Sequence, residues 1–450
     1  MAQTDMTRGP IGPALLRYAV PLMLGNLFQL TYNLVDAVIA GRFIGQEALA
    51  AEGIAGSVMN LLILFISGLS LGAGVLMSGF FGAGEEALLR RELSTVLLFG
   101  AGFSVVVTVP GILCAGPLLR LLQAPEELMG ITGSYLRIIF LGIPFTWFYN
   151  ALASALKSVG DARTPLRFLV CSSVLNAALD LVLIGGLGFG IRCSALTTVA
   201  AEAVSAGLAW YHIRRRVPLL SPGRGEWRID GPLLGRTLRY GTVTALQQAV
   251  QPVGKLLIQG CVNGLGMEVI AAWNAVTRVD DFAFAPEQSI AHGITTFVAQ
   301  NRGRARAERD FDRERIHWGF RTGLALEAGY WALLCAAVLL LRGPVLSLFT
   351  ATEDAALADI GGDYLGLMAL FYLLPAMTNG VQGYFRGCGR MRVTLAATLI
   401  QTVLRVVFTF LLVPGLGLRG IACACAIGWS VMLLWEVPLY LRSRRSGRDE

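Results

Sequence analysis

The sequence predicts an all-α membrane protein with twelve transmembrane helices in two pseudo-symmetric six-helix lobes around a central cleft. Of the 450 residues, 55% are apolar and only 15% are charged. Soluble domains carry about 25% charged residues. The apolar stretches also exceed the ~20 residues that span hydrocarbon, and the two halves of the chain resemble each other. This composition argues against a soluble enzyme or a nucleic-acid-binding protein.

Charged or Gly- and Pro-rich breaks separate the apolar stretches. We expect membrane-spanning helices at residues 13–41, 50–81, 94–116, 132–157, 164–186, 191–213, 234–262, 269–299, 317–342, 361–386, 393–414 and 419–441. The first residues lack the zones of a cleavable signal peptide, so we expect the first helix to direct insertion.

The basic residues predict the orientation in the membrane. An even number of spans places both termini on one side, and 27 of the 37 Lys and Arg residues fall on that side. By the positive-inside rule both termini of this multi-pass protein are cytoplasmic. The net charge of +7 then reflects topology, so the bilayer is the expected partner of a monomer and no nucleic acid is needed.

Metal and redox chemistry find little support in the sequence. The eight cysteines include no CxxC pair, and the three histidines are dispersed. We therefore predict no enzyme activity, no cofactor, no disulfide framework and no zinc site.

An internal repeat divides the chain. Residues 1–215 form the predicted N-terminal lobe, 216–233 a cytoplasmic linker, and 234–450 the C-terminal lobe with a basic tail. Matching positions in the two halves are Leu16-Arg17-Tyr18 with Leu238-Arg239-Tyr240, Gly45 with Gly266, Gly72 with Gly293, Asn150 with Asn379, and Gly160 with Gly389. Both halves enter the membrane from the same side, as in alternating-access transporters. A duplicated bundle without a transport path is the alternative.

Two acidic residues at membrane depth require a reason, because an ionised carboxylate there costs about 2.5–3.5 kcal/mol or more. Asp36, Asp180 and Thr198 each lie six or seven residues from the outer end of a span, or about 9–10 Å deep. Asn176 shares a helix face with Asp180. Their oxygens suit Na⁺, or H⁺ if one carboxyl is protonated. Alternatively, each acid accepts a hydrogen bond from a neighbouring helix.

The repeat does not duplicate this predicted cation site. The second-half positions that correspond to Asp36, Asn176 and Asp180 are Leu257 or Ile258, Arg405 and Thr409.

Other polar residues within the spans are candidates for the substrate cavity. These are Gln29, Asn33, Lys255 and Glu287. Lys255 has the alternative of pairing with an acid, and Arg278 is expected to pair with Asp280 or Asp281. Pro21 lacks an N–H and permits a kink early in the first span.

Three segments resemble the multidrug and toxic compound extrusion (MATE) family. They are residues 22–36 (LMLGNLFQLTYNLVD) continuing to Ala51, residues 156–165 (LKSVGDARTP) and residues 295–301 (TTFVAQN). The resemblance covers essentially the whole chain. It implies two six-helix lobes, cation-coupled export, and an amino-terminal cation site at Asp36, Asn176, Asp180 and Thr198. Some relatives place a carboxylate in the seventh or tenth span, but here the tenth has none.

We therefore predict an antiporter of the bacterial inner membrane, coupled to Na⁺ or H⁺, that exports small amphipathic organic compounds by alternating access. A flippase for a lipid-linked precursor is the alternative, and Lys255 and Arg405 are its only cationic support. A membrane enzyme ranks last.

Overall fold

The computed structural model describes residues 4–347 and 355–446, which are almost entirely helical and contain no strand. The first half comprises α1 (Ile11–Phe43), α2 (Gln46–Ala83), α3 (Glu86–Leu113), α4 (Ala115–Leu121), α5 (Glu126–Ser158), α6 (Arg163–Asp180), the π-helical turn η1 (Leu181–Gly186) and α7 (Ile191–Arg216). Short 3₁₀ turns η2 (Pro218–Leu220) and η3 (Arg224–Glu226) follow. The second half comprises α8 (Gly231–Val262), η4 (Asn263–Leu265), α9 (Met267–Ala307), α10 (Glu314–Ser347), α11 (Ala355–Phe371), α12 (Leu373–Gly387), α13 (Met391–Leu416) and α14 (Leu418–Ser446).

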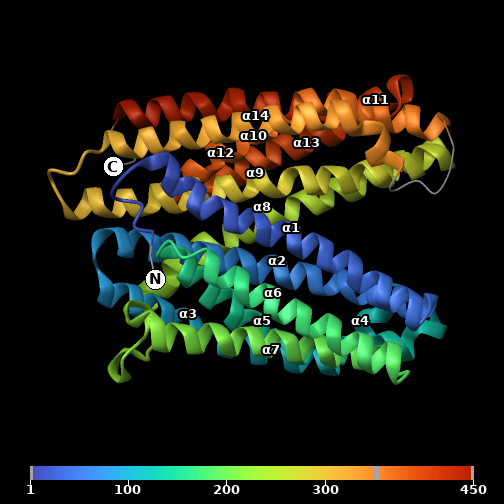
Figure 1. Cartoon of the computed structure of the whole chain (residues 1–450), viewed down its shortest axis with the longest axis horizontal. Coiled ribbons are helices and arrows are strands. Elements are labelled where there is room, and N and C mark those ends of the chain that lie inside the picture. The colour runs from blue at the N-terminus through green and yellow to red at the C-terminus, as the bar shows by residue number, and fades with distance from the viewer. Residues whose placement is uncertain (1–3, 348–354, 447–450) are drawn as a thin grey trace. The chain divides into compact units, whose positions relative to one another are not determined.

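The all-α membrane fold predicted from the sequence is confirmed. Eight described helices are long and apolar enough to cross a membrane, and α11 with α12, bent by 43°, makes a ninth candidate. The more polar helices α7, α8 and α9 complete the twelve predicted spans. Within each half, the long helices run side by side (Figure 1).

Equivalent glycines lie in equivalent turns between helices in the two halves. Gly45 and Gly266, which precede α2 and α9, have φ angles of 114° and 98°. Gly160 and Gly389, in the turns before α6 and α13, have φ angles of 84° and 74°. Only glycine adopts these angles without strain. The sequence repeat is thus also a repeat of backbone conformation.

The chain forms two compact units that exchange the first parts of α1 and α8. The first unit contains residues 24–245, and the second contains residues 5–23 and 246–450. The first part of α1 therefore belongs to the second unit, and the first part of α8 belongs to the first. The lobe boundaries predicted at residues 215 and 234 follow the sequence repeat. The compact units instead meet within α1, between residues 23 and 24, and within α8, between residues 245 and 246.

Repeat-related contacts hold both exchanged segments. In the second unit, the Tyr18 hydroxyl lies 2.9 Å from Thr296 Oγ1, and a methyl group on Gly293 would lie 3.6 Å from the Tyr18 ring. In the first unit, a methyl group on Gly72 would lie 2.6 Å from the Gly241 nitrogen. Gly72 corresponds to Gly293, and Gly241 follows the tyrosine that corresponds to Tyr18. The two exchanges are therefore equivalent by the repeat.

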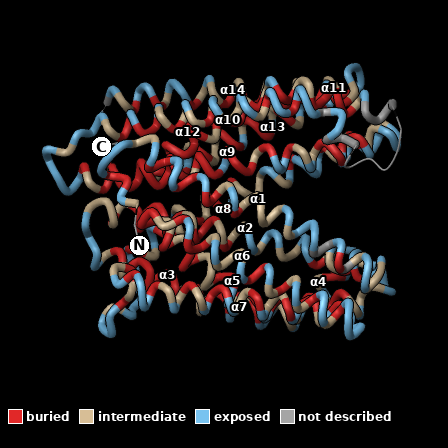
Figure 2. Tube along the Cα trace, viewed as in Figure 1, coloured by how far each residue is buried: buried red, intermediate tan, exposed pale blue. Residues whose placement is uncertain are grey.

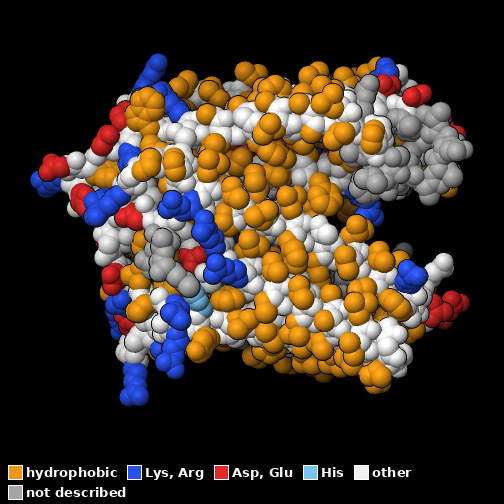
Figure 3. Space-filling view, viewed as in Figure 1, with side chains coloured by type: hydrophobic (Ala, Val, Ile, Leu, Met, Phe, Trp, Pro, Cys, Tyr) orange, Lys and Arg blue, Asp and Glu red, His pale blue; other side chains and the backbone are white. Residues whose placement is uncertain are grey.

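Each unit has its own apolar core. Trp147, packed against Phe99 and Phe103, is a large residue of the first core. Trp273 and Tyr364, whose rings meet edge to face, belong to the second. Figure 2 shows the buried residues along the helix faces inside each unit. Apolar side chains also cover much of the outer surface, and Lys and Arg gather at the helix ends near the termini (Figure 3). Apolar outer faces fit a lipid environment.

The linker between the halves is bound to the start of α3. Arg90 Nε donates to both Glu226 oxygens, at 2.9 and 3.0 Å. The Gly223 N–H donates to Glu226 at 2.7 Å. The Gly223 hydrogen bond and the Arg90 guanidinium lower the pKa of Glu226. Thr237, at the start of α8, donates to the buried Glu92 on α3. These contacts hold the linker and the first part of α8 in the first unit.

Close packing of α2 and α8 gives a stability prediction. We expect Gly72→Ala to lower the apparent melting temperature in detergent, because its methyl group would overlap the Gly241 backbone. Overpacking of this kind costs about 1–3 kcal/mol. Gly102→Ala on α3 is the control, because nothing lies within 4 Å of the position that its methyl group would take. That variant should be neutral or stabilised, since Ala has the higher helix propensity. Equal melting temperatures for the two variants would contradict this packing.

Candidate cation site

The candidate cation site lies at the end of α6 in the first unit. Asn176 and Asp180 are one turn apart on this helix, and each is only 1% exposed. The π-helical turn η1 begins directly after Asp180. Such turns are rare and frequently mark functional sites. The wider turn changes the direction of the following side chains without ending the helix.

Hydroxyl groups from two other helices contact these side chains. Tyr32 on α1 donates to Asn176 Oδ1. Thr197 on α7 donates to Asp180 Oδ1 at 2.5 Å. Asp36 lies on α1 one turn beyond Tyr32, but its side chain is outside the described part of the structure. Three helices therefore supply oxygen atoms to one buried cluster.

The structure places Thr197, rather than Thr198, against Asp180. The Thr198 hydroxyl instead donates to the Ser194 carbonyl oxygen of its own helix at 2.9 Å. Successive residues on a helix point about 100° apart, so a depth estimate alone does not choose between them. Ser194 also donates to Glu52 on α2 at 3.2 Å. Sequence reasoning missed both Thr197 and Glu52.

The spacing of residues along the helices predicts some of the side-chain contacts in this cluster. Tyr32 and Asp36 are four residues apart, so they share a face of α1. Ser194 and Thr198 are also four apart, and Thr197 donates back to the Ser194 carbonyl oxygen at 2.8 Å. No sequence pattern, in contrast, pairs α2 with α7. The contact of Glu52 with Ser194 depends on tertiary packing.

The cluster has the chemistry of a site for a small hard cation. Its contacting atoms are carboxylate, amide and hydroxyl oxygens, which Na⁺ prefers, and a carboxylate also accepts H⁺. The Asn176 Nδ2 atom is buried and has no hydrogen-bond partner among the described residues. Its amide oxygen, facing Tyr32, is the atom suited to a cation. Within the described residues, no three His, Cys, Asp or Glu side chains group as metal ligands.

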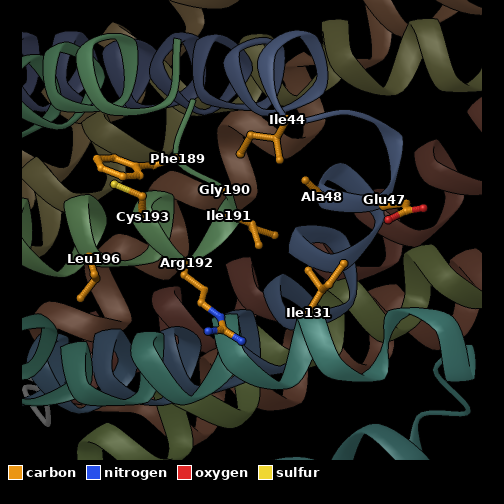
Figure 4. Close-up of a pocket in the computed structure, with 10 residues that line it drawn as sticks. All are labelled: Ile44, Glu47, Ala48, Ile131, Phe189, Gly190, Ile191, Arg192, Cys193 and Leu196. Carbon is orange, nitrogen blue, oxygen red and sulfur yellow. The ribbon is translucent and has the colours of Figure 1, made fainter. Parts of the chain in front are cut away.

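A pocket of about 590 Å³ lies next to this cluster in the first unit (Figure 4). The lining residues come from the junction of α1 and α2, from α5 and from the start of α7, and they are Ile44, Glu47, Ala48, Ile131, Phe189, Gly190, Ile191, Arg192, Cys193 and Leu196. Cys193 joins the pocket to the cluster, because its carbonyl oxygen accepts a hydrogen bond from Thr197 at 3.1 Å. The pocket is mainly apolar, with Glu47 and Arg192 as its charged residues.

The corresponding region of the second unit holds a fixed positive charge. Arg405, which corresponds to Asn176, is 9% exposed and attracts Asp280 electrostatically. Tyr372 and Tyr364 donate to the two Asp280 oxygens at 2.5 and 3.0 Å. Thr409, in place of Asp180, donates to its own helix. A guanidinium therefore stands where the first unit has its amide.

The remaining predicted site residues have different environments. On α1, Gln29 donates to Asn33 at 2.9 Å, and both belong to the first unit. Lys255 pairs with Asp281 at 2.7 Å in the second unit. Glu287 is 0% exposed, so the cavity-lining position expected for it is not seen. The expected partner of Asp281, Arg278, is replaced by Lys255. α1 continues through Pro21, three residues before the first unit begins at Leu24.

Comparison with known proteins identifies the family. The MatE family profile matches residues 21–182 and 244–411, which is more than half of the chain. The chain belongs to the MatE family. It is 30% identical to the probable multidrug resistance protein YoeA of Bacillus subtilis, over 75% of this chain and 73% of that protein. It is 27% identical to the probable multidrug resistance protein YpnP of the same organism, over 94% of this chain and 93% of that one. MatE proteins are membrane transporters and not enzymes.

Solved structures share the fold. The outward-facing structure of a multidrug resistance MATE transporter matches with a TM-score of 0.90 and 23% identity, over 99% of this chain and 98% of that one. A transporter from Pyrococcus furiosus, described as having a binding pocket of reverse polarity, matches with a TM-score of 0.89 and 22% identity. The match covers 100% of this chain and 99% of that one. Two MatE lobes of six helices therefore describe this chain.

Adjacent threonines on α7 provide a matched test of the site geometry. We expect Thr197→Val to lower the thermal stability of the MatE protein in detergent, because it removes a donor from buried Asp180. Leaving a buried acceptor without its donor costs about 1–3 kcal/mol. Thr198→Val is the control and should change stability less, since its hydroxyl serves only its own helix. The reverse order of the two variants would overturn the placement.

Proposed function

We propose that this MatE protein is an antiporter that couples export of small amphipathic organic compounds to inward movement of Na⁺ or H⁺. The oxygen cluster of Asn176, Asp180, Tyr32 and Thr197, with Asp36 on the same helix as Tyr32, is the observation that supports cation coupling. It is buried, rich in oxygen and restricted to one unit. Ionisable residues at membrane depth are costly and commonly functional.

Coupling requires that the cation bind two conformations unequally. A cation that binds one state ten times more tightly shifts the equilibrium by about 1.4 kcal/mol. Helix α1 is suited to transmit this shift. Its first part belongs to the second unit, its later part carries Tyr32 and Asp36, and Pro21 lies just before the change of unit. Cation binding at the cluster therefore acts on a helix that is anchored in both units.

The pocket beside the cluster supports a route for the cation. Cys193 lines the pocket, and its carbonyl oxygen accepts a hydrogen bond from Thr197, which also donates to Asp180. We propose that this pocket opens on the outer side, with both termini cytoplasmic in the bacterial inner membrane and the protein functioning as a monomer.

The names of relatives suggest the substrate class. Several similar proteins are named as multidrug resistance proteins, including one from Thermotoga maritima. One relative from Shewanella oneidensis, 24% identical over 67% of this chain and 67% of that protein, is named as an FAD transporter. We propose an organic cation as the substrate and treat an anionic dinucleotide as the competing cargo in transport assays.

A lipid-linked precursor flippase receives less support. Such a function needs free positive charge to hold a pyrophosphate. Lys255 is paired with Asp281, and Arg405 is buried close to Asp280. The positive charges of the two residues that suggested a flippase are therefore balanced by nearby aspartates. Rescue of cell-wall or polysaccharide synthesis in a flippase-deficient strain would reverse this preference.

Removing either acid of the cluster should abolish coupled export. We expect Asp36→Asn and Asp180→Asn to insert normally but to reduce efflux of a fluorescent organic cation from vesicles by at least about tenfold, because the amide cannot replace the carboxylate as a cation ligand. The control is Asp363→Asn, whose carboxylate pairs with Arg419 at an exposed position. It should export normally. Full efflux by Asp36→Asn would sink the assignment.

The coupling ion can be determined in the same system. In proteoliposomes, ΔpH and ΔNa⁺ are imposed separately while uptake of the fluorescent cation is recorded. We expect one gradient to drive transport by the wild type and neither to drive it through Asp180→Asn. Transport by the variant under the effective gradient would show that the cluster does not couple.

A further inference from the structure

Two buried carboxyl groups on neighbouring helices of the second unit are used by neither the fold nor the proposed cation site. They are Glu287 on α9 and Glu327 on α10, and both are 0% exposed. Glu287 Oε1 and both Glu327 oxygens have no hydrogen-bond partner among the described residues. Within the described part of the chain, no Lys or Arg forms an ion pair with either. Polar atoms buried in this way normally have partners.

Two consecutive residues of α12 bring the carboxyl groups together. Asn379 Nδ2 lies 3.5 Å from Glu287 Oε2, as a long hydrogen bond. A methyl group on the next residue, Gly380, would lie 3.8 Å from Glu327 Cγ. Glu287 and Glu327 also repel each other electrostatically. Helices α9, α10 and α12 therefore enclose the pair.

The other titratable groups around the pair do not neutralise it. Asp280, two turns earlier on α9, adds negative potential at Glu287. The phenols of Tyr330 and Tyr372 also lie within electrostatic range of Glu287 and carry no positive charge. His292 follows Glu287 by five residues, about 140° around the helix, and so points to another side of α9. The surroundings therefore disfavour two ionised carboxylates.

The first unit has no equivalent of this pair. Ile66, in the apolar core, lies six residues before Gly72, just as Glu287 lies six residues before Gly293. Asn150, which corresponds to Asn379, donates to the Thr146 carbonyl oxygen of its own helix at 2.8 Å. The asparagine is common to both halves, but only in the second does it meet an acid. The shared helix packing therefore forms in the first unit with an apolar residue, Ile66, at the position of Glu287.

We propose that Glu287 and Glu327, with Asn379, form a proton-binding site in the second unit, separate from the cation cluster of the first. Two ionised carboxylates without a counter-cation are costly in a low dielectric, and protonation removes the charge. A proton also supplies a donor to a group of unpartnered acceptors. We assign H⁺ as the ligand, because a proton needs a single carboxylate oxygen whereas a metal ion needs several oxygen ligands.

The role of this site in transport rests on the proposed antiport function. The site holds its proton while buried and releases it when a conformational change admits water. Its proton would then be a second coupling ion beside the cation of the first unit. The occupancy of the site by a proton, in contrast, can be measured without transport.

The dependence of thermal stability on pH tests the proton directly. A buried acid that stays protonated in the folded protein and ionises on unfolding makes stability fall as pH rises. We expect the melting temperature of the full-length protein in detergent to fall between pH 6 and pH 9, and to fall less in Glu327→Gln and Glu287→Gln. Gln is the nearest isostere of a protonated Glu, so both variants should fold.

An exposed, paired acid is the control. Asp363 pairs with Arg419 at an exposed position, so burial does not hold a proton on it. Asp363→Asn should keep the wild-type slope of melting temperature against pH. Wild-type slopes in both Glu287→Gln and Glu327→Gln would overturn the proposal, and so would an equally reduced slope in Asp363→Asn.

Proton counting separates this proposal from the antiport function. On adding ethidium to protein in unbuffered solution, we expect Glu327→Gln to release about one proton fewer than wild type. If that variant releases as many, the proton site is wrong, even where Asp180→Asn has lost export and the antiport function holds. If Asp180→Asn exports fully, the antiport coupling is wrong, while the pH slopes still decide whether Glu287 and Glu327 bind a proton.

Discussion

The absence of water from the hydrocarbon core is the constraint on which this structure depends. A polar group at membrane depth can be stabilised only by partners inside the protein, because lipid offers none. Helices satisfy the backbone, and the described residues are accordingly almost all helical. Side chains must be satisfied one by one. In the first unit Thr197 donates a hydrogen bond to Asp180. In the second unit Tyr364 and Tyr372 donate hydrogen bonds to Asp280.

The same constraint makes the two halves chemically different although they share a backbone plan. Equivalent glycines turn the chain at equivalent points, and equivalent contacts hold the exchanged parts of α1 and α8. The polar side chains then diverge. Asn176 and Asp180 in the first unit give way to Arg405 and Thr409 in the second, so a guanidinium lies in the second unit where the first has an amide. The two units thus share one backbone plan and differ in the polar residues that they bury.

The exchange of helix segments also explains how a buried site can influence a whole transporter. A helix that belonged to one unit would move with that unit alone. Because α1 and α8 each cross from one unit to the other, a local event on either helix acts on both units. Pro21 removes a backbone hydrogen bond just before α1 changes unit, which lowers the cost of bending there. Under the proposed cation coupling, binding beside Tyr32 and bending near Pro21 would act along one continuous helix.

The sequence by itself determined the fold class, the twelve spans and the repeat, because apolar length and residue spacing are local properties. It also singled out Asn176 and Asp180, which are both buried, because polar residues within an apolar stretch are visible in the sequence. Tertiary structure alone decided which neighbours these residues meet. Thr197 rather than Thr198, Glu52 beside Ser194, Lys255 with Asp281, and Glu287 near Glu327 each depend on the rotation and packing of separate helices. Those contacts join residues far apart in the chain, and no local pattern encodes them.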